Sequence, residues 1–323
     1  MRKLILPAIF IAASACAVED NSNQPGANTA AQSAQDIWRI NPTGDLNQFF
    51  DCLQTDGLTI VSAHRGGPQP GYPENAIETM SAILKDAPAI MEIDVATSSD
   101  GVLYLMHDDT LDRTTSGSGQ ANGLPWSRLQ SLNLEDNDGR STPYQPSRFD
   151  DALKWANGRT VLQIDFKKTT RYEDVTREIR NQNAEDRVIL IAYSMASARK
   201  LHNLAPRAMI SLSVNSQSEL NRAVAAGIPA DKLLGFTGTQ SPRPRLFSTL
   251  NARDVEVIFG TLGGRNSLDR DIERSGDSEL YAQIAANGVD IIATDRPIAA
   301  HRALASANKG ARSGACGITG PTN

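Results

Sequence analysis

The sequence predicts an α/β fold in which eight parallel strands alternate with helices and close into a (β/α)8, or TIM, barrel. Short apolar, β-rich runs alternate with helical stretches from Leu58 onward, and several of these stretches end in Gly or Asn before the next run. A chain of 323 residues is long enough for one such domain. The predicted strands are Leu58–Ala63, Ala89–Ala96, Thr160–Phe166, Val188–Tyr193, Met209–Val214, Lys232–Phe236, Val255–Gly260 and Val289–Thr294.

The stretches between these runs have helical composition, and one region interrupts the rhythm. Residues 76–86, 171–182, 195–205, 216–227 and 277–288 are the clearest helix candidates. Val102–Met106 is expected to add an extra strand or extended piece after the second strand. The region Asp112–Pro146 is rich in Gly, Ser, Asn, Asp and Pro, so we expect a small insertion on the barrel rim.

Composition excludes several classes of protein. With 40% hydrophobic and 21% charged residues, the chain is neither disordered nor a polytopic membrane protein. A net charge of −5 argues against a nucleic-acid partner, because such a protein needs a basic face to neutralise phosphates. A content of 5% aromatic residues also disfavours platforms on which bases stack.

The N-terminus indicates export. Two basic residues precede the apolar run Leu4–Ala13, which is too short to span a bilayer, so residues 1–15 are expected to be a signal peptide. Cleavage can follow Ala15 directly, or Cys16 can be the lipidated residue of a bacterial lipoprotein, which we favour. Residues 16–44 are predicted to be a flexible polar linker before a domain at 45–323. The expected location is the periplasm or the outer membrane, with membrane contact only through this anchor.

Two cysteines remain outside the signal. Cys52 lies just before the first predicted strand and Cys316 lies near the C-terminus. The first and last units of a closed barrel are neighbours, and an exported protein can keep disulfides. A Cys52–Cys316 disulfide and two unrelated thiols are equally compatible with the sequence.

Ionisable residues gather where the first three strands end, which is where barrel active sites lie. His64 and Arg65 follow the first strand. Glu92 and Asp94 lie two positions apart on the second strand, so their carboxylates share one face. His107 follows the Val102–Met106 piece.

The third strand adds Asp165 and Lys167, again on one face. Buried carboxylates are costly unless they are paired or coordinated, and all-oxygen ligands indicate Ca²⁺ or Mg²⁺ rather than zinc. Arg65 and Lys167 beside such a cation would suit a phosphate group.

The order of these motifs resembles that of the glycerophosphodiester phosphodiesterase family over roughly residues 58–300. The motifs are HRGG (His64–Gly67), PEN (Pro73–Asn75), EIDV (Glu92–Val95), DG (Asp100–Gly101), HDDTLDRTT (His107–Thr115), IDFK (Ile164–Lys167) and TDRP (Thr294–Pro297). The resemblance implies a (β/α)8 barrel, a divalent cation and two catalytic histidines. It also implies hydrolysis of a small glycerophosphodiester to glycerol 3-phosphate and an alcohol.

Carried over residue by residue, the resemblance makes His64 and His107 the acid–base pair and Glu92 and Asp94 metal ligands. Asp165 stands where the family usually has Glu, which keeps the charge but shortens the reach by about one bond. The family's Thr after PEN is Ala76 here, and its W-T-V-N element is replaced by Phe259–Gly264. The replaced loop leaves the identity of the alcohol open.

Several alternatives stay open. A related barrel phospholipase of D or C type acting on lipid phosphodiesters is a second enzymatic interpretation. A lipoprotein that binds phosphodiesters without catalysis is a third. Glu74 is interpreted as a first-turn acid of a helix, slightly ahead of a residue that supports the site, and Asp295 as part of a helix start rather than a catalytic residue. Gly263–Arg265 is either a phosphate loop or a flexible rim loop.

Overall fold

The structure is a computed structural model that describes Met1 and residues 36–322. The predicted signal peptide after Met1, the predicted lipidation site Cys16 and residues 16–35 of the predicted linker lie outside the described residues.

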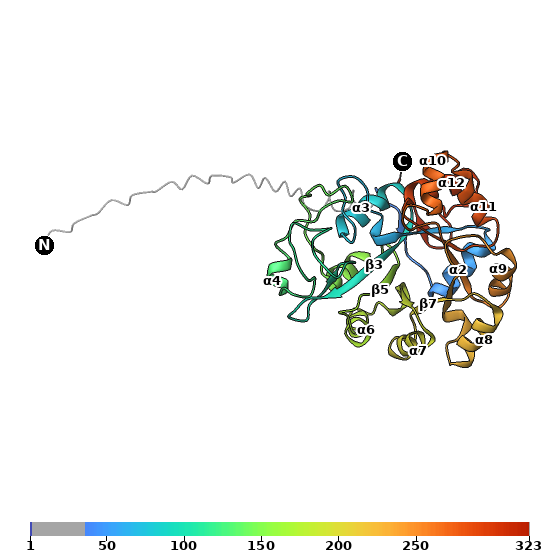
Figure 1. Cartoon of the computed structure of the whole chain (residues 1–323), viewed down its shortest axis with the longest axis horizontal. Helices are drawn as coiled ribbons and strands as arrows, with labels where there is room; N and C mark the ends of the chain where they lie inside the picture. The colour runs from blue at the N-terminus through green and yellow to red at the C-terminus, as the bar shows by residue number, and fades with distance from the viewer. Residues whose placement is uncertain (2–35, 323) are drawn as a thin grey trace. The chain divides into compact units, whose positions relative to one another are not determined.

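Eight parallel strands form the closed barrel predicted from the sequence. Each strand pairs with the next along the chain, and the eighth returns to the first, with Ile291 opposite Ile60 and Thr294 opposite Ala63. All eight predicted runs coincide with strands, which confirms the fold class (Figure 1). The strands are β2 (Ile60–Ala63), β3 (Ala89–Thr97), β5 (Leu162–Phe166), β6 (Val188–Ala192), β7 (Met209–Ser213), β8 (Leu233–Phe236), β9 (Glu256–Gly260) and β10 (Ile291–Thr294).

Helices follow the strands and pack around them (Figure 1). Their apolar faces and the outward side chains of the strands form one continuous core, as amphipathic helices on a parallel sheet require. The helices are α3 (Ile77–Asp86), α5 (Phe149–Ala156), α6 (Tyr172–Asn181), α7 (Met195–Leu204), α8 (Gln217–Ala225), α9 (Pro244–Asn251), α10 (Leu268–Ser275), α11 (Glu279–Ala285) and α12 (Pro297–Ser306), with single 3₁₀ turns η1 (His64–Gly66), η2 (Glu185–Arg187) and η3 (Ala230–Lys232).

One further helix, α2 (Leu46–Thr55), covers the end of the barrel at which the strands begin, which we call the floor. Its buried Leu46, Phe49, Phe50 and Leu53 share a cluster with the first residues of the strands. The side chain of Asp45 caps this helix by accepting from the Gln48 N–H at 3.0 Å. The opposite end of the barrel, where the strands end, is therefore the open one, which we call the mouth.

The first and last strands of the described domain pair with each other beside the floor. Strand β1 (Arg39–Ile40) pairs antiparallel with β11 (Ile318–Thr319), and Ile40 is buried. This pairing corrects the predicted linker of residues 16–44, because its last residues belong to the folded domain. A two-residue strand has no local pattern and is set by its distant partner, since Ile40 lies opposite Ile318, 278 residues further along the chain.

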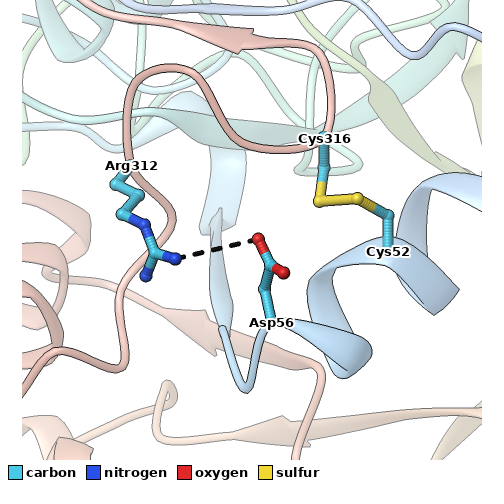
Figure 2. The surroundings of a disulfide bond; sticks show 4 residues. All are labelled: Cys52, Asp56, Arg312 and Cys316. Carbon is cyan, nitrogen blue, oxygen red and sulfur yellow. Dashed lines mark ion pairs between the residues drawn. A yellow bond between two sulfur atoms is a disulfide. The ribbon is translucent and has the colours of Figure 1, made fainter.

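Cys52 on α2 and Cys316 before β11 form a disulfide bond with a Cα–Cα distance of 5.7 Å (Figure 2). Of the two alternatives left open by the sequence, the structure contains the bond. An ion pair between Arg312 and Asp56, 3.8 Å apart, lies beside it (Figure 2). The disulfide therefore ties the helix that covers the floor to the C-terminal segment.

The predicted insertion after β3 is a small ordered layer. Strand β4 (Leu103–Leu105) pairs antiparallel with the end of β3, and α4 (Trp126–Leu129) follows within the insertion. Tyr104, Leu111 and Leu129 are buried in a cluster of their own. The Tyr104 hydroxyl donates to the Ala121 carbonyl at 2.7 Å. This packing holds the loop that contains His107 at the mouth.

Among the described residues, no helix combines the length and hydropathy needed to cross a bilayer.

Candidate active site

The turn after β2 places the first histidine and an arginine at the mouth. Arg65 has a φ of 52° and is followed by Gly66 and Gly67, also at positive φ. A Cβ on Gly67 would lie 2.9 Å from Ile83, so this position needs glycine. Left-handed backbone at a non-glycine residue is strained and persists where the surroundings over-determine it. The HRGG segment therefore holds its two polar side chains in a fixed and costly arrangement.

Three buried carboxylates meet at the end of neighbouring strands. Glu92 and Asp94 project from β3, and Asp165 of β5 lies directly opposite Asp94 in the sheet register. One oxygen from each of the three lies within 4.8 Å of the others. The predicted trio is thus brought together in space.

The protein surrounds this trio with only a few compensating groups. Lys167 Nζ lies 3.2 Å from Asp94 and 3.3 Å from Asp165, and the Arg65 N–H donates to Glu92 at 2.8 Å. Burial and the charge of Asp94 raise the pKa of Glu92 to about 8. Burial also raises the pKa of Asp165, against the lowering effect of Lys167.

The donor set fits a hard divalent cation. Three buried oxygen donors converge, and the raised pKa values of Glu92 and Asp165 indicate that the neighbouring cationic side chains compensate the negative charge only in part. Asn75, itself at a φ of 57°, fixes Asp94 by donating to its carboxylate at 2.8 Å and accepting from its N–H at 2.9 Å. The position of this candidate ligand is therefore fixed by a residue of the PEN motif.

His64 is held by a carboxylate from the far end of the chain. Its Nδ1 lies 2.6 Å from Oδ1 of Asp295, and the other oxygen of Asp295, Oδ2, accepts from the Gly263 N–H at 3.0 Å. Burial lowers the pKa of His64, but the hydrogen bond with Asp295 and the negative charge of Glu92 raise it overall. Asp295 in turn is placed by Asp269, which accepts its N–H at 2.7 Å.

His107 is held in the same way from the insertion. Its Nδ1 lies 2.7 Å from Asp108. Arg113 donates to Asp108 at 2.6 and 2.9 Å and to Glu74 at 2.8 Å through each of two nitrogens. These hydrogen bonds lower the pKa of Asp108 well below its usual range. Glu74, Asp108 and His107 are also close enough together to hold a metal ion, but Arg113 already supplies the positive charge at this position.

The buried Glu74 also joins the two histidine segments. It accepts from Arg65 at 3.1 and 3.2 Å as well as from Arg113. A single carboxylate thus positions both the arginine beside His64 and the arginine beside His107.

The predicted site residues lie at one place. A cavity of about 260 Å³ is lined by His64, His107, Glu92, Asp94, Asp165 and Lys167, and Arg65 lines the adjoining groove. Two interpretations made from the sequence need correction. Glu74 and Asp295 do precede helices α3 and α12, but their side chains serve the site: Glu74 pairs with two arginines, which is the alternative that the sequence left open, and Asp295 pairs with His64. The only signal for Asp295 was its TDRP motif at the end of β10.

Comparison with known proteins agrees with this geometry. The sequence matches the Glycerophosphoryl diester phosphodiesterase family over residues 64–299. A glycerophosphodiester phosphodiesterase from Caldanaerobacter subterraneus is 27% identical over 161 residues, which span 48% of this chain and 66% of that protein.

Two solved structures show the fold relationship. The crystal structure of a glycerophosphoryl diester phosphodiesterase from Parabacteroides distasonis is similar with a TM-score of 0.78 and 30% identity, covering 88% of this chain and 99% of that one. An Oleispira antarctica phosphodiesterase in complex with the product sn-glycerol-3-phosphate shares the fold with a TM-score of 0.61 at 18% identity, covering 77% of this chain and 97% of that one. The chain described here belongs to the glycerophosphoryl diester phosphodiesterase family and is an enzyme of that class.

Proposed function

We propose that this enzyme hydrolyses small glycerophosphodiesters to glycerol 3-phosphate and an alcohol, with His64 and His107 as the acid–base pair. The observation that carries the proposal is the convergence of both histidines, the three carboxylates and Lys167 on one cavity at the mouth. The family's activity and the product named for the Oleispira antarctica structure support the same substrate class.

The two cationic side chains suit an anionic phosphodiester. Arg65 Nε is buried and has no hydrogen-bond partner among the described residues, and it lies 3.9 Å from Asp94. A buried donor without a partner is costly, and a phosphate oxygen would satisfy it. Lys167 would neutralise the same group from β5.

A divalent cation, Ca²⁺ or Mg²⁺, would be held by Glu92, Asp94 and Asp165. When bound, it would supply electrostatic stabilisation of the charge that develops on the phosphate. Asn75 and Lys167 contact Asp94 from either side and so fix the position of the carboxylates. Carboxylates held in this way would in turn orient the phosphodiester.

The histidines are arranged for proton transfer through their Nε2 atoms. In each ring Nδ1 faces a carboxylate, Asp295 for His64 and Asp108 for His107. A carboxylate at Nδ1 holds the tautomer in which Nε2 is free to accept or deliver a proton. One histidine would take the proton from the attacking oxygen, water or the glycerol 2-hydroxyl, and the other would protonate the leaving alkoxide.

The test is release of glycerol 3-phosphate, followed by ³¹P NMR, from a glycerophosphodiester in the presence of Ca²⁺ or Mg²⁺. His64→Ala and His107→Ala are each expected to lose turnover by about 10²-fold or more, with the circular dichroism spectrum unchanged. Retained turnover in either variant would refute its assigned role. The surface-helix variant Arg274→Ala serves as the matched control.

Two other functions are separated by the same samples. Turnover of lysophospholipids or phosphoinositides in place of water-soluble glycerophosphodiesters would identify the related lipid-directed barrel enzyme. Binding of phosphodiesters without turnover would identify a non-catalytic lipoprotein.

We further propose export to the periplasm with a lipid anchor on Cys16, because an apolar run and then small residues followed by Cys16 precede the domain. Mass spectrometry of the N-terminal peptide of the purified protein tests the anchor, because an N-terminal Cys16 without lipid would exclude it.

A further inference from the structure

A second and larger cavity adjoins the catalytic one. It is a groove of about 740 Å³, bounded by the HRGG turn, Asn137 and Asp138 of the insertion, the loop after β9, α10 and the start of α12. His64 lines both the groove and the smaller cavity of about 260 Å³ that holds the carboxylates. The two cavities therefore meet at a catalytic residue.

This arrangement separates the two arms of a phosphodiester. A phosphorus atom beside His64 and the carboxylates would direct one ester arm into the smaller cavity and the other into the groove. The constant glycerol arm suits the smaller cavity by size. The variable leaving alcohol, on which the sequence is silent, then lies in the groove.

The chemistry of the groove disfavours a quaternary ammonium headgroup. Its lining residues, all within the described part of the chain, include no Phe, Tyr or Trp. Proteins recognise choline-like cations mainly through the faces of aromatic rings. A choline group in this groove would have no such partner.

A primary ammonium group also lacks a free carboxylate. Glu273 lies 2.8 Å from Arg270 and 3.6 Å from Arg296, and Asp138 lies 2.7 Å from Arg140. The remaining carboxylates of the groove, Glu74, Asp269 and Asp295, are engaged by arginines, by hydroxyl and N–H donors, and by His64.

The same pairs present donors and acceptors side by side. Arg270 and Glu273 lie one turn apart on α10, and Arg296 lies across from them at the start of α12. A guanidinium next to a carboxylate can donate to one hydroxyl and accept from its neighbour, so neighbouring hydroxyls of a polyol match this pattern.

We propose that the groove receives a hydroxyl-rich leaving alcohol, glycerol or a cyclic polyol, rather than choline or ethanolamine. This inference rests on the proposed function and adds the substrate class of the leaving group. Arg270 and Glu273 are then specificity residues for that alcohol.

The test compares kcat/KM for four substrates of the full chain with Ca²⁺ or Mg²⁺ present: glycerophosphoglycerol, glycerophosphoinositol, glycerophosphoethanolamine and glycerophosphocholine. We expect the two polyol substrates to exceed the two amine substrates by about tenfold or more. In Arg270→Ala this preference is expected to fall to about a third or less, mainly through KM of the polyol substrates. Arg274→Ala, on the same helix but outside the groove, is expected to keep it.

The outcomes separate the inference from the proposed function. Turnover with equal or greater preference for choline or ethanolamine overturns the inference and leaves the hydrolysis intact. A polyol preference that Arg270→Ala does not change overturns the assignment to this groove. Failure to turn over any of the four substrates overturns the proposed function, and the inference falls with it.

Discussion

The mouth and the floor of this barrel each bury a cluster of acids, and the two clusters differ in what surrounds them. At the mouth, Asp94 and Asp165 lie opposite each other with Lys167 between them. At the floor, Glu256 begins β9 and Asp290 immediately precedes β10, and both are buried. The charges of Asp51 and Asp254 also act on Glu256, so this neighbourhood is acidic throughout.

At the floor, protonation of Glu256 removes the negative charge that burial disfavours. Asp290 accepts from the Val257 N–H at 2.7 Å and from Gln54 of α2 at 3.4 Å, while one oxygen of Glu256 has no hydrogen-bond partner among the described residues. Burial and the charge of Asp290 raise the pKa of Glu256 to about 9, so it is neutral near pH 7. A buried acid pair is therefore not a metal site by itself. The mouth differs because a third carboxylate, the cationic side chains of Arg65 and Lys167 and an open cavity converge there.

The largest effect expected from this comparison is on turnover. Asp94→Asn removes one of the three oxygen donors proposed to hold a cation and is expected to lower kcat/KM by about a thousandfold. Glu256→Gln mimics the neutral acid at the floor and is expected to change kcat/KM less than about twofold. Steady-state hydrolysis of glycerophosphoglycerol at saturating Ca²⁺ or Mg²⁺ measures both, and similar losses in the two variants would erase the distinction.

The disulfide tests whether the floor stabilises the domain independently of the mouth. The double variant Cys52→Ser/Cys316→Ser is expected to lose about 2–4 kcal/mol of the free energy of unfolding, because the bond closes a very long loop. Turnover at 25 °C should be retained, since the bond lies beside α2. Urea denaturation with and without reductant gives the stability, and wild type in reductant should match the variant. A loss of turnover in the folded variant would contradict the separation.

At the mouth, Asp295→Asn isolates the role of a residue that positions His64. The hydrogen bond with Asp295 raises the pKa of His64, so removing the carboxylate lowers that pKa. Whichever limb of the pH–rate profile His64 controls should move to lower pH, with kcat down by about tenfold. Asp271→Asn, exposed on α10, is the control. An unmoved profile with reduced kcat would reduce Asp295 to a structural role.

A last effect expected at the floor, on stability rather than turnover, is a slope of the free energy of unfolding with pH. Because the folded pKa of Glu256 is raised from 4.5 to about 9, its contribution is fully present below about pH 4.5 and is lost as pH rises through 9. Stability should therefore fall toward pH 9 by at most about 1.4 kcal/mol per pH unit from this group. Glu256→Gln should remove that part of the slope in urea unfolding at pH 6 and pH 9. Equal slopes in both proteins would show that Glu256 is already ionised.

The sequence predicted the strands well because each buried strand is a short apolar run with punctuation on either side. It also predicted the mouth, because residues that follow strands of a parallel barrel must gather at one end. Glu92, Asp94, Asp165 and His64 were placed at the mouth in this way, whereas His107, which follows the extra strand β4, was singled out by the family motif.

Contacts between distant segments were harder to predict. Asp295 reaches His64 across 231 residues, and no local pattern marks that pairing. Glu74 looked like a first-turn acid of a helix, and only the fold shows that it serves two arginines. The acid pair at the floor was missed for the same reason, because Glu256 and Asp290 lie on different strand units.

The most direct test of the site at the mouth is turnover of a glycerophosphodiester after removal of metal. Enzyme treated with EDTA and then desalted should release no glycerol 3-phosphate above the level of His64→Ala. Addition of Ca²⁺ or Mg²⁺ should restore the turnover of the wild-type enzyme, whereas the turnover of Asp94→Asn should stay low. Full turnover by the metal-free enzyme would contradict the assignment of Glu92, Asp94 and Asp165 as cation ligands.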